Sequence, residues 1–160
     1  MLVKSIIDEC IQDYYKTSML IATVKCDWKC CKEAEIDKSV CQNSSLARQP
    51  NIEIPVHKIY ERYINNLLSE AIVIAGLEPF LQFNDIKLLI DYFRNHDCLD
   101  DFVIYTGYKA KEIGEEINEL QQYLNIIIKF GRYIPNQNPI FDKVLQVELA
   151  SNNQYAIRIS

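Results

Sequence analysis

Short apolar runs alternate with amphipathic helical patterns along most of the chain. The runs that predict buried strands are residues 18–25, 70–76, 101–107 and 125–131, all rich in Ile, Val and other strand-forming side chains. Between and after them, apolar residues recur every three or four positions over residues 56–70, 84–96 and 109–124, which predicts helices with one buried face. This alternation is typical of βαβ units, so the sequence predicts an α/β fold built on a parallel sheet.

Unusual residues follow three of the predicted strands. The stretches are KCDWKCC at residues 25–31, AGLEPF at 75–80 and YTGYK at 105–109. In parallel α/β sheets, ligands bind at the carboxyl ends of the strands, in the loops that lead to the helices. We therefore expect a functional site where these three stretches meet.

Composition narrows the classes of function. The 160 residues predict a single domain, residues 1–160, and the net charge of −5 without clustered Lys or Arg argues against a nucleic-acid surface. The first residues have no uninterrupted apolar region, and no run approaches the eighteen or so apolar residues of a membrane span, which predicts a cytoplasmic protein. In that compartment thiols stay reduced, so clustered cysteines favour metal ligation or catalysis over disulfides. The isolated Cys10 and Cys98 are expected to be small core residues.

Four of the six cysteines lie between residues 26 and 41. Cys26, Cys30, Cys31 and Cys41 could enclose a structural zinc ion, although the second C-x2-4-C pair of a usual zinc site is absent. Four thiolates could instead hold an iron–sulfur cluster completely. Three thiolates could hold a cluster and leave one iron open. The residues alone leave these alternatives open.

The cysteine stretch resembles the start of the radical S-adenosylmethionine (SAM) enzymes. In that superfamily a C-x3-C-x2-C motif supplies three thiolates to a [4Fe-4S] cluster, and Cys26-Asp-Trp-Lys-Cys30 matches its C-x3-C part. The closest resemblance is to the small activating enzymes of anaerobic ribonucleotide reductase, in which the third cysteine is followed by an aromatic residue and Asn. Here Cys41 is followed by Gln42 and Asn43. The resemblance implies Cys26, Cys30 and Cys41 as the metal ligands.

Further motifs follow in the same order as in those activating enzymes. Gly76-Leu77-Glu78-Pro79 resembles the Gly-Gly-Glu-Pro element that contacts the SAM amino group, and Thr106-Gly107-Tyr108 resembles their TGY segment. Residues 125–134 are similar to their penultimate strand and the turn after it, and residues 150–154 are similar to a G-S-S-N-Q segment near their C-termini. The resemblance extends over residues 18–159.

Three features depart from that family. Ten residues separate Cys30 from Cys41 where the family has two, and Cys31 is the rival third ligand. Leu77 stands in place of a glycine in the SAM loop, and the Gly-Pro-Gly-x-Arg segment that precedes the first strand of the activating enzymes is absent. The last departure leaves the partner protein open.

The resemblance implies an incomplete parallel (β/α) barrel of the radical SAM type that binds a [4Fe-4S] cluster and SAM. Reductive cleavage of SAM would yield a 5′-deoxyadenosyl radical that activates a glycyl radical enzyme, with a flavodoxin-like electron donor. The residues that the resemblance assigns to cofactor binding are Val40, Asn43, Gly76, Glu78, Pro79, Thr106 and Tyr108. The alternatives are a radical SAM enzyme that modifies another peptide or small molecule, and a non-catalytic iron–sulfur redox or interaction module.

Overall fold

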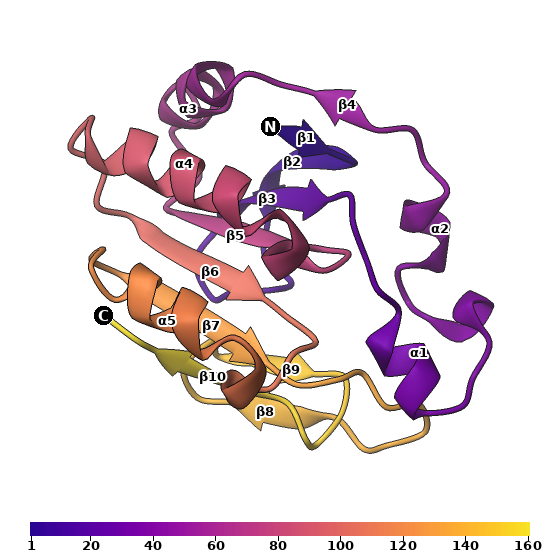
Figure 1. Cartoon of the computed structure of the whole chain (residues 1–160). Helices are drawn as coiled ribbons and strands as arrows, with labels where there is room; N and C mark the ends of the chain where they lie inside the picture. Colours follow the sequence, from indigo (N-terminus) through magenta and orange to yellow (C-terminus); the bar gives the residue numbers. More distant parts are fainter.

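The computed structural model describes residues 1–160 and contains one open six-stranded sheet in the order β10-β7-β6-β5-β3-β2 (Figure 1). Its four central strands are parallel, and they are β3 (Ser18–Thr23), β5 (Ala71–Gly76), β6 (Asp101–Tyr105) and β7 (Ile126–Phe130). All five residues of β7 are buried, as expected of a strand that is covered on both faces. The four strands predicted from apolar runs are therefore confirmed.

Both edge strands run antiparallel to their neighbours, so the sheet is mixed and differs from the fully parallel sheet that the sequence predicts. Strand β2 (Ser5–Cys10) pairs with β3, and β10 (Tyr155–Arg158) pairs with β7. Strand β2 reads SIIDEC and β10 reads YAIR, and neither contains the longer apolar run that predicted the central strands. Because β2 and β10 do not pair with each other, the sheet stays open. An incomplete barrel of the radical SAM type remains a prediction.

Three helices pack against one face of the sheet (Figure 1). They are α3 (Val56–Ile64), α4 (Phe83–Arg94) and α5 (Gly114–Leu120). The apolar stripe of α4 packs into the core, where Phe93 contacts the ring of Phe102 edge-on with centroids 5.3 Å apart. The helix predicted over residues 109–124 is instead divided into η3 (Ala110–Glu112) and α5, because Ile113 has a non-helical backbone conformation.

The hairpin of β8 (Ile140–Asp142) and β9 (Val147–Leu149) covers part of the opposite face. Leu145 and Leu149 pack against Val73 and Val103 of the sheet. The sequence did not predict this hairpin, nor the two-stranded pairing of β1 (Leu2–Val3) with β4 (Ile52–Glu53). Beyond the hairpin, this face of the sheet lines a cavity.

The cysteine-rich segment lies at the carboxyl ends of the parallel strands. Between β3 and β4 the chain forms α1 (Lys29–Glu33), η1 (Lys38–Val40) and α2 (Ser44–Ala47), and η2 (Pro79–Gln82) follows β5. In Figure 1 the arrowheads of β3 and β6 point toward the side on which α1 and α2 lie. The three unusual stretches therefore meet at one edge of the sheet.

The two isolated cysteines differ in their surroundings. Cys98 belongs to the main hydrophobic core, as predicted. Cys10 is only partly buried on the edge strand β2, with its Sγ 3.3 Å from Asp13 Oδ2, so its prediction as a core residue is wrong. In the whole chain, the helices are too short or too polar to cross a lipid bilayer.

Candidate functional site

A cavity of about 760 Å³ opens at the carboxyl ends of the four parallel strands. Its walls include the thiol-bearing residues Cys26, Cys30 and Cys41, whereas Cys31 does not line it. Five of the seven residues expected to bind the cofactor also line the cavity, and they are Asn43, Gly76, Glu78, Thr106 and Tyr108. Val40, which is exposed, and Pro79, which is buried, do not line it. The cofactor roles of all seven residues remain predictions.

The loop between Cys26 and Cys30 is a tight local turn. Trp28 adopts a left-handed conformation with φ of 60°, and its backbone N–H donates a hydrogen bond of 3.3 Å to Cys26 Sγ. The N–H of Lys29 donates to Asp27 Oδ1 at 3.1 Å, as in an Asx turn. Positive φ is uncommon for a large side chain, so these bonds hold an unfavourable backbone conformation in place. The turn brings Cys30 into the first turn of α1 beside the cavity.

Cys30 packs against a glycine at the end of β6. A Cβ built on Gly107 would lie 3.0 Å from Cys30 Sγ and 3.5 Å from Glu78 Oε2. Only the absence of a side chain at Gly107 allows the thiol to come this close. Burial raises the pKa of the Cys30 thiol, and the backbone of Tyr133 and the charge of Arg132 oppose this rise only in part. Burial also raises the pKa of Cys26, to about 11.

Cys31 and Cys41 have different surroundings, although the sequence left them as rivals. Successive residues of an α-helix point about 100° apart, so Cys31 turns away from the face that presents Cys30. Its side chain is 4% exposed, and burial raises its pKa, with a further contribution from the neighbouring Cys41 thiol. Cys41 follows η1 and reaches the cavity. The structure thus gathers Cys26, Cys30 and Cys41 around one cavity, whereas Cys31 is buried within α1 and does not line it.

This donor set fits a cluster better than a single ion. All six cysteines are free thiols, and no group of three or more His, Cys, Asp or Glu side chains surrounds a common point as one metal ion requires. A structural zinc ion is usually held by four such ligands in a tetrahedron. An iron–sulfur cluster spreads its irons over a cube, and its thiolates can stand further apart around a cavity.

Asn43 and Gly76 join the cysteine segment to the end of β5. The side-chain amide of Asn43 donates a hydrogen bond to the carbonyl oxygen of Gly76. Gly76 has φ of 89°, and a Cβ there would meet Ala22 at 3.0 Å and Leu46 at 3.1 Å, so both conformation and space require glycine. The segment that carries Cys41 is therefore attached to the sheet just before Glu78.

Glu78 connects the ends of β5 and β6. Its Oε1 accepts hydrogen bonds from Thr106 Oγ1 at 2.7 Å and from the N–H of Phe80 at 3.2 Å. Its Oε2 accepts one bond, from the N–H of Gly107 at 2.9 Å. The residue is 5% exposed, and burial raises the pKa of its carboxyl group above the ordinary value despite these bonds. Oε2 therefore keeps acceptor capacity, and Glu78 lines the cavity.

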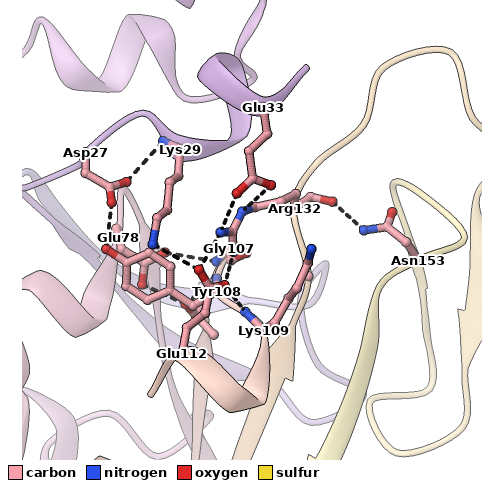
Figure 2. A network of polar contacts seen from close by, with 12 residues as sticks. Asp27, Lys29, Glu33, Glu78, Gly107, Tyr108, Lys109, Glu112, Arg132 and Asn153 are labelled. Atoms are coloured by element: carbon pink, nitrogen blue, oxygen red, sulfur yellow. Dashed lines mark hydrogen bonds and ion pairs between the residues drawn. The ribbon is translucent and has the colours of Figure 1, made fainter. Parts of the chain in front are cut away.

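Tyr108, in the loop after β6, bonds to the loop between Cys26 and Cys30. Its hydroxyl donates a 2.9 Å hydrogen bond to Asp27 Oδ2, between the first two cysteines (Figure 2). The ammonium of Lys29 lies 4.8 Å from the centre of the Tyr108 ring. The predicted ligand residue Tyr108 thus contacts the loop that carries Cys26 and Cys30.

Two basic residues near the cavity were not predicted from sequence. Lys129 on β7 lines the cavity, is 7% exposed, forms no salt bridge and donates one long bond of 3.4 Å to the carbonyl of Gly131. Burial lowers the pKa of its ammonium to about 8. Arg132 is 4% exposed and forms the ion pairs drawn in Figure 2. A lysine inside the apolar run of residues 125–131 was the one available sequence signal.

Comparison with known proteins gives one match. A family model described as a 4Fe-4S single cluster domain matches residues 18–156. No curated protein matches the chain, and no solved structure matches it. The matched residues include all four clustered cysteines and the carboxyl ends of the four parallel strands.

Proposed function

The chain belongs to the 4Fe-4S single cluster domain family, and from this premise we propose that it is a radical SAM protein that activates a glycyl radical enzyme. Cys26, Cys30 and Cys41 would hold the [4Fe-4S] cluster with their thiolates and leave one iron open. The observation that carries this assignment is that these three cysteines line one cavity, whereas Cys31, within α1, is buried and does not line it.

The cavity wall offers groups suited to a zwitterionic ligand. The Oε2 atom of Glu78 accepts only the bond from Gly107, so it can also accept from an ammonium group. Lys129 supplies a buried positive charge that forms no salt bridge, although the charges of Glu78 and Asp13 act on it, and this charge favours an anionic group in the same cavity. Both groups suit the amino-acid part of SAM.

When bound, the cluster would supply the electron for reductive cleavage of SAM, and the protein would orient the ligand and exclude water. Binding requires the thiolate forms, so Cys26 and Cys30, whose pKa values burial raises, would release protons as iron binds. Tyr108 and Asn43 would hold the loop against the strand ends through Asp27 and Gly76. An incomplete barrel, a cytoplasmic location and a flavodoxin-like electron donor belong to the same proposal.

The test is anaerobic reconstitution with iron and sulfide, followed by dithionite, SAM and chromatographic assay of 5′-deoxyadenosine. We expect product from the wild type and from Cys31→Ala, and none from Cys41→Ala. Cys98→Ala, which removes a thiol from the core, serves as the matched control. Product from Cys41→Ala but not from Cys31→Ala would overturn the ligand assignment, and zinc in place of iron would overturn the proposal.

A second candidate is an iron–sulfur redox or interaction module without SAM cleavage. Leu77 favours it, because its side chain lines the cavity at the position where the resembled loop has glycine. A stable four-iron cluster that yields no 5′-deoxyadenosine would support this second function. A radical SAM enzyme that acts on another peptide or small molecule would also form 5′-deoxyadenosine, but it would not activate a glycyl radical enzyme.

A further inference from the structure

Arg132 lies two residues after the end of β7, and its side chain is almost fully enclosed, with 5% exposed. Its guanidinium donates two bonds to Glu33, of 3.1 and 2.9 Å, and two to Glu112, of 2.7 and 2.8 Å. Its Nη1 also donates to the carbonyl of Gly107, at 2.5 Å. A guanidinium has five N–H donors, so these five bonds match its full capacity.

The acceptors belong to three separate parts of the site. Glu33 is the last residue of α1, Glu112 lies in η3, and Gly107 follows β6 (Figure 2). Lys29, the first residue of α1, also pairs with Glu112 at 2.9 Å. Both ends of α1 are therefore connected to η3, and Cys30 lies between them.

Helix α1 depends on such contacts for its position. It has five residues, too few to be stable by themselves, and no side chain caps its N-terminus. The backbone of Arg132 is itself held, since Asn153 Nδ2 donates to its carbonyl at 2.9 Å. The C-terminal segment that carries Asn153 therefore holds Arg132, whose side chain bonds to Glu33 at the end of α1.

The Arg132 side chain also passes close to the Cys30 thiol. A Cβ on Gly107 would lie 3.0 Å from Cys30 Sγ and 4.0 Å from Arg132 Cδ, so these two atoms are at most 7.0 Å apart. A positive charge next to a cluster ligand stabilises the reduced, more negative form of the cluster. Arg132 can therefore affect both the place of the thiolate and the charge around it.

We propose that Arg132 is a positioning residue for the iron–sulfur cluster: it clamps α1 through Glu33 and Glu112, which holds Cys30 in ligating position, and its charge raises the reduction potential. The inference rests on the proposed role of Cys26, Cys30 and Cys41 as cluster ligands. The two effects can be separated because Arg132→Lys keeps the charge but loses the planar fork, whereas Arg132→Gln loses both.

The first experiment measures iron release from the reconstituted proteins to a chelator, together with the cluster's midpoint potential by anaerobic redox titration. We expect both variants to release iron at least tenfold faster than the wild type. Arg132→Lys keeps the wild-type potential, and Arg132→Gln lowers it by about 59 mV, which corresponds to a tenfold change for one electron. The matched control is Arg158→Gln, which breaks a 2.7 Å pair with Asp101 and leaves both quantities unchanged. Wild-type release rates and potentials in both Arg132 variants would overturn the proposal.

The second experiment uses the cluster-free proteins and therefore does not depend on iron binding. Hydrogen exchange of the α1 amides, including the Ala34 N–H that bonds to Cys30 O at 3.1 Å, should be at least tenfold faster in Arg132→Gln. Unchanged exchange would overturn the clamp. If the wild type binds no iron but Arg132→Gln still exchanges faster, the clamp is supported and the proposed function is refuted. Failure of the clamp and failure of the proposed function can therefore be distinguished.

Discussion

Gly107 provides the sharpest test of how the cysteine loop packs on the strand ends. In Gly107→Ala the new Cβ would lie 3.0 Å from Cys30 Sγ, so one of the two must move by a few tenths of an ångström. Gly107 is held by a 2.9 Å bond from its N–H to Glu78 and by the bond from Arg132 to its carbonyl. Helix α1 has five residues and is attached mainly through its ends, so we expect the thiol to move.

The expected cost to stability is modest and the cost to cluster binding is large. Extra methyl groups in well-packed sites usually cost about 1–3 kcal/mol, and relief through α1 places Gly107→Ala near about 1 kcal/mol. Urea unfolding of the cluster-free protein measures this loss as a lower midpoint at constant slope. Iron bound per chain after reconstitution should fall below half of the wild-type value, because the new methyl group fills the space against which the Cys30 thiol packs and displaces it from its place beside the cavity.

Gly114→Ala is the matched control, since nothing lies within 4 Å of a Cβ at that position. Alanine is the better helix former, so this variant should keep its iron and gain up to about 1 kcal/mol of stability. Full iron content together with unchanged unfolding in Gly107→Ala would refute the packing argument.

Two further predictions concern the core and the ion pairs. Phe93→Ala should lower the free energy of unfolding by about 3–5 kcal/mol in urea titrations, because a fully buried ring is lost, while Leu67→Ala at a position 93% exposed should change it by less than about 0.5 kcal/mol. A loss below 1 kcal/mol in Phe93→Ala would contradict the assigned core. The bonds from Arg132 hold the pKa of Glu112 below its ordinary 4.5, so its stabilisation is complete above pH 4.5 and is lost as the pH falls below that value. Glu112→Gln should therefore be less stable at pH 7 by about 1 kcal/mol, a figure limited by partial exposure, and its unfolding curve should approach the wild-type curve near pH 3. A difference that stays constant with pH would show that the charge on Glu112 is not the cause.

The central strands could be predicted because each is a continuous apolar run covered on both faces. Strands β2, β8, β9 and β10 escaped prediction because they are short or partly exposed, and their apolar residues do not form continuous runs. The parallel arrangement of the central strands correctly indicated that the candidate site lies at their carboxyl ends. Their antiparallel neighbours required the three-dimensional structure.

The candidate site was predictable only where residues are close in sequence. The cysteine spacing and the Gly-x-Glu-Pro and Thr-Gly-Tyr segments drew attention to the correct strand ends. The pairing of Arg132 with Glu33 joins residues 99 positions apart, and no local pattern signals it. Cys41 lines the cavity and Cys31 does not. For Cys31 this depends on the direction of its side chain, which is set by the residue at which α1 begins.

An open sheet leaves two strand edges that could pair with another copy of the chain. On β2 the register shifts between Ile7 and Cys10, which forms a bulge at the edge. Asp8 in this bulge carries a charge and pairs with Arg62 at 2.6 Å. Bulges and charges interrupt the regular row of donors and acceptors that an added strand would need, and β10 offers only four residues at the other edge. Strand β2, which the sequence pattern did not predict, therefore protects the protein against edge-to-edge aggregation.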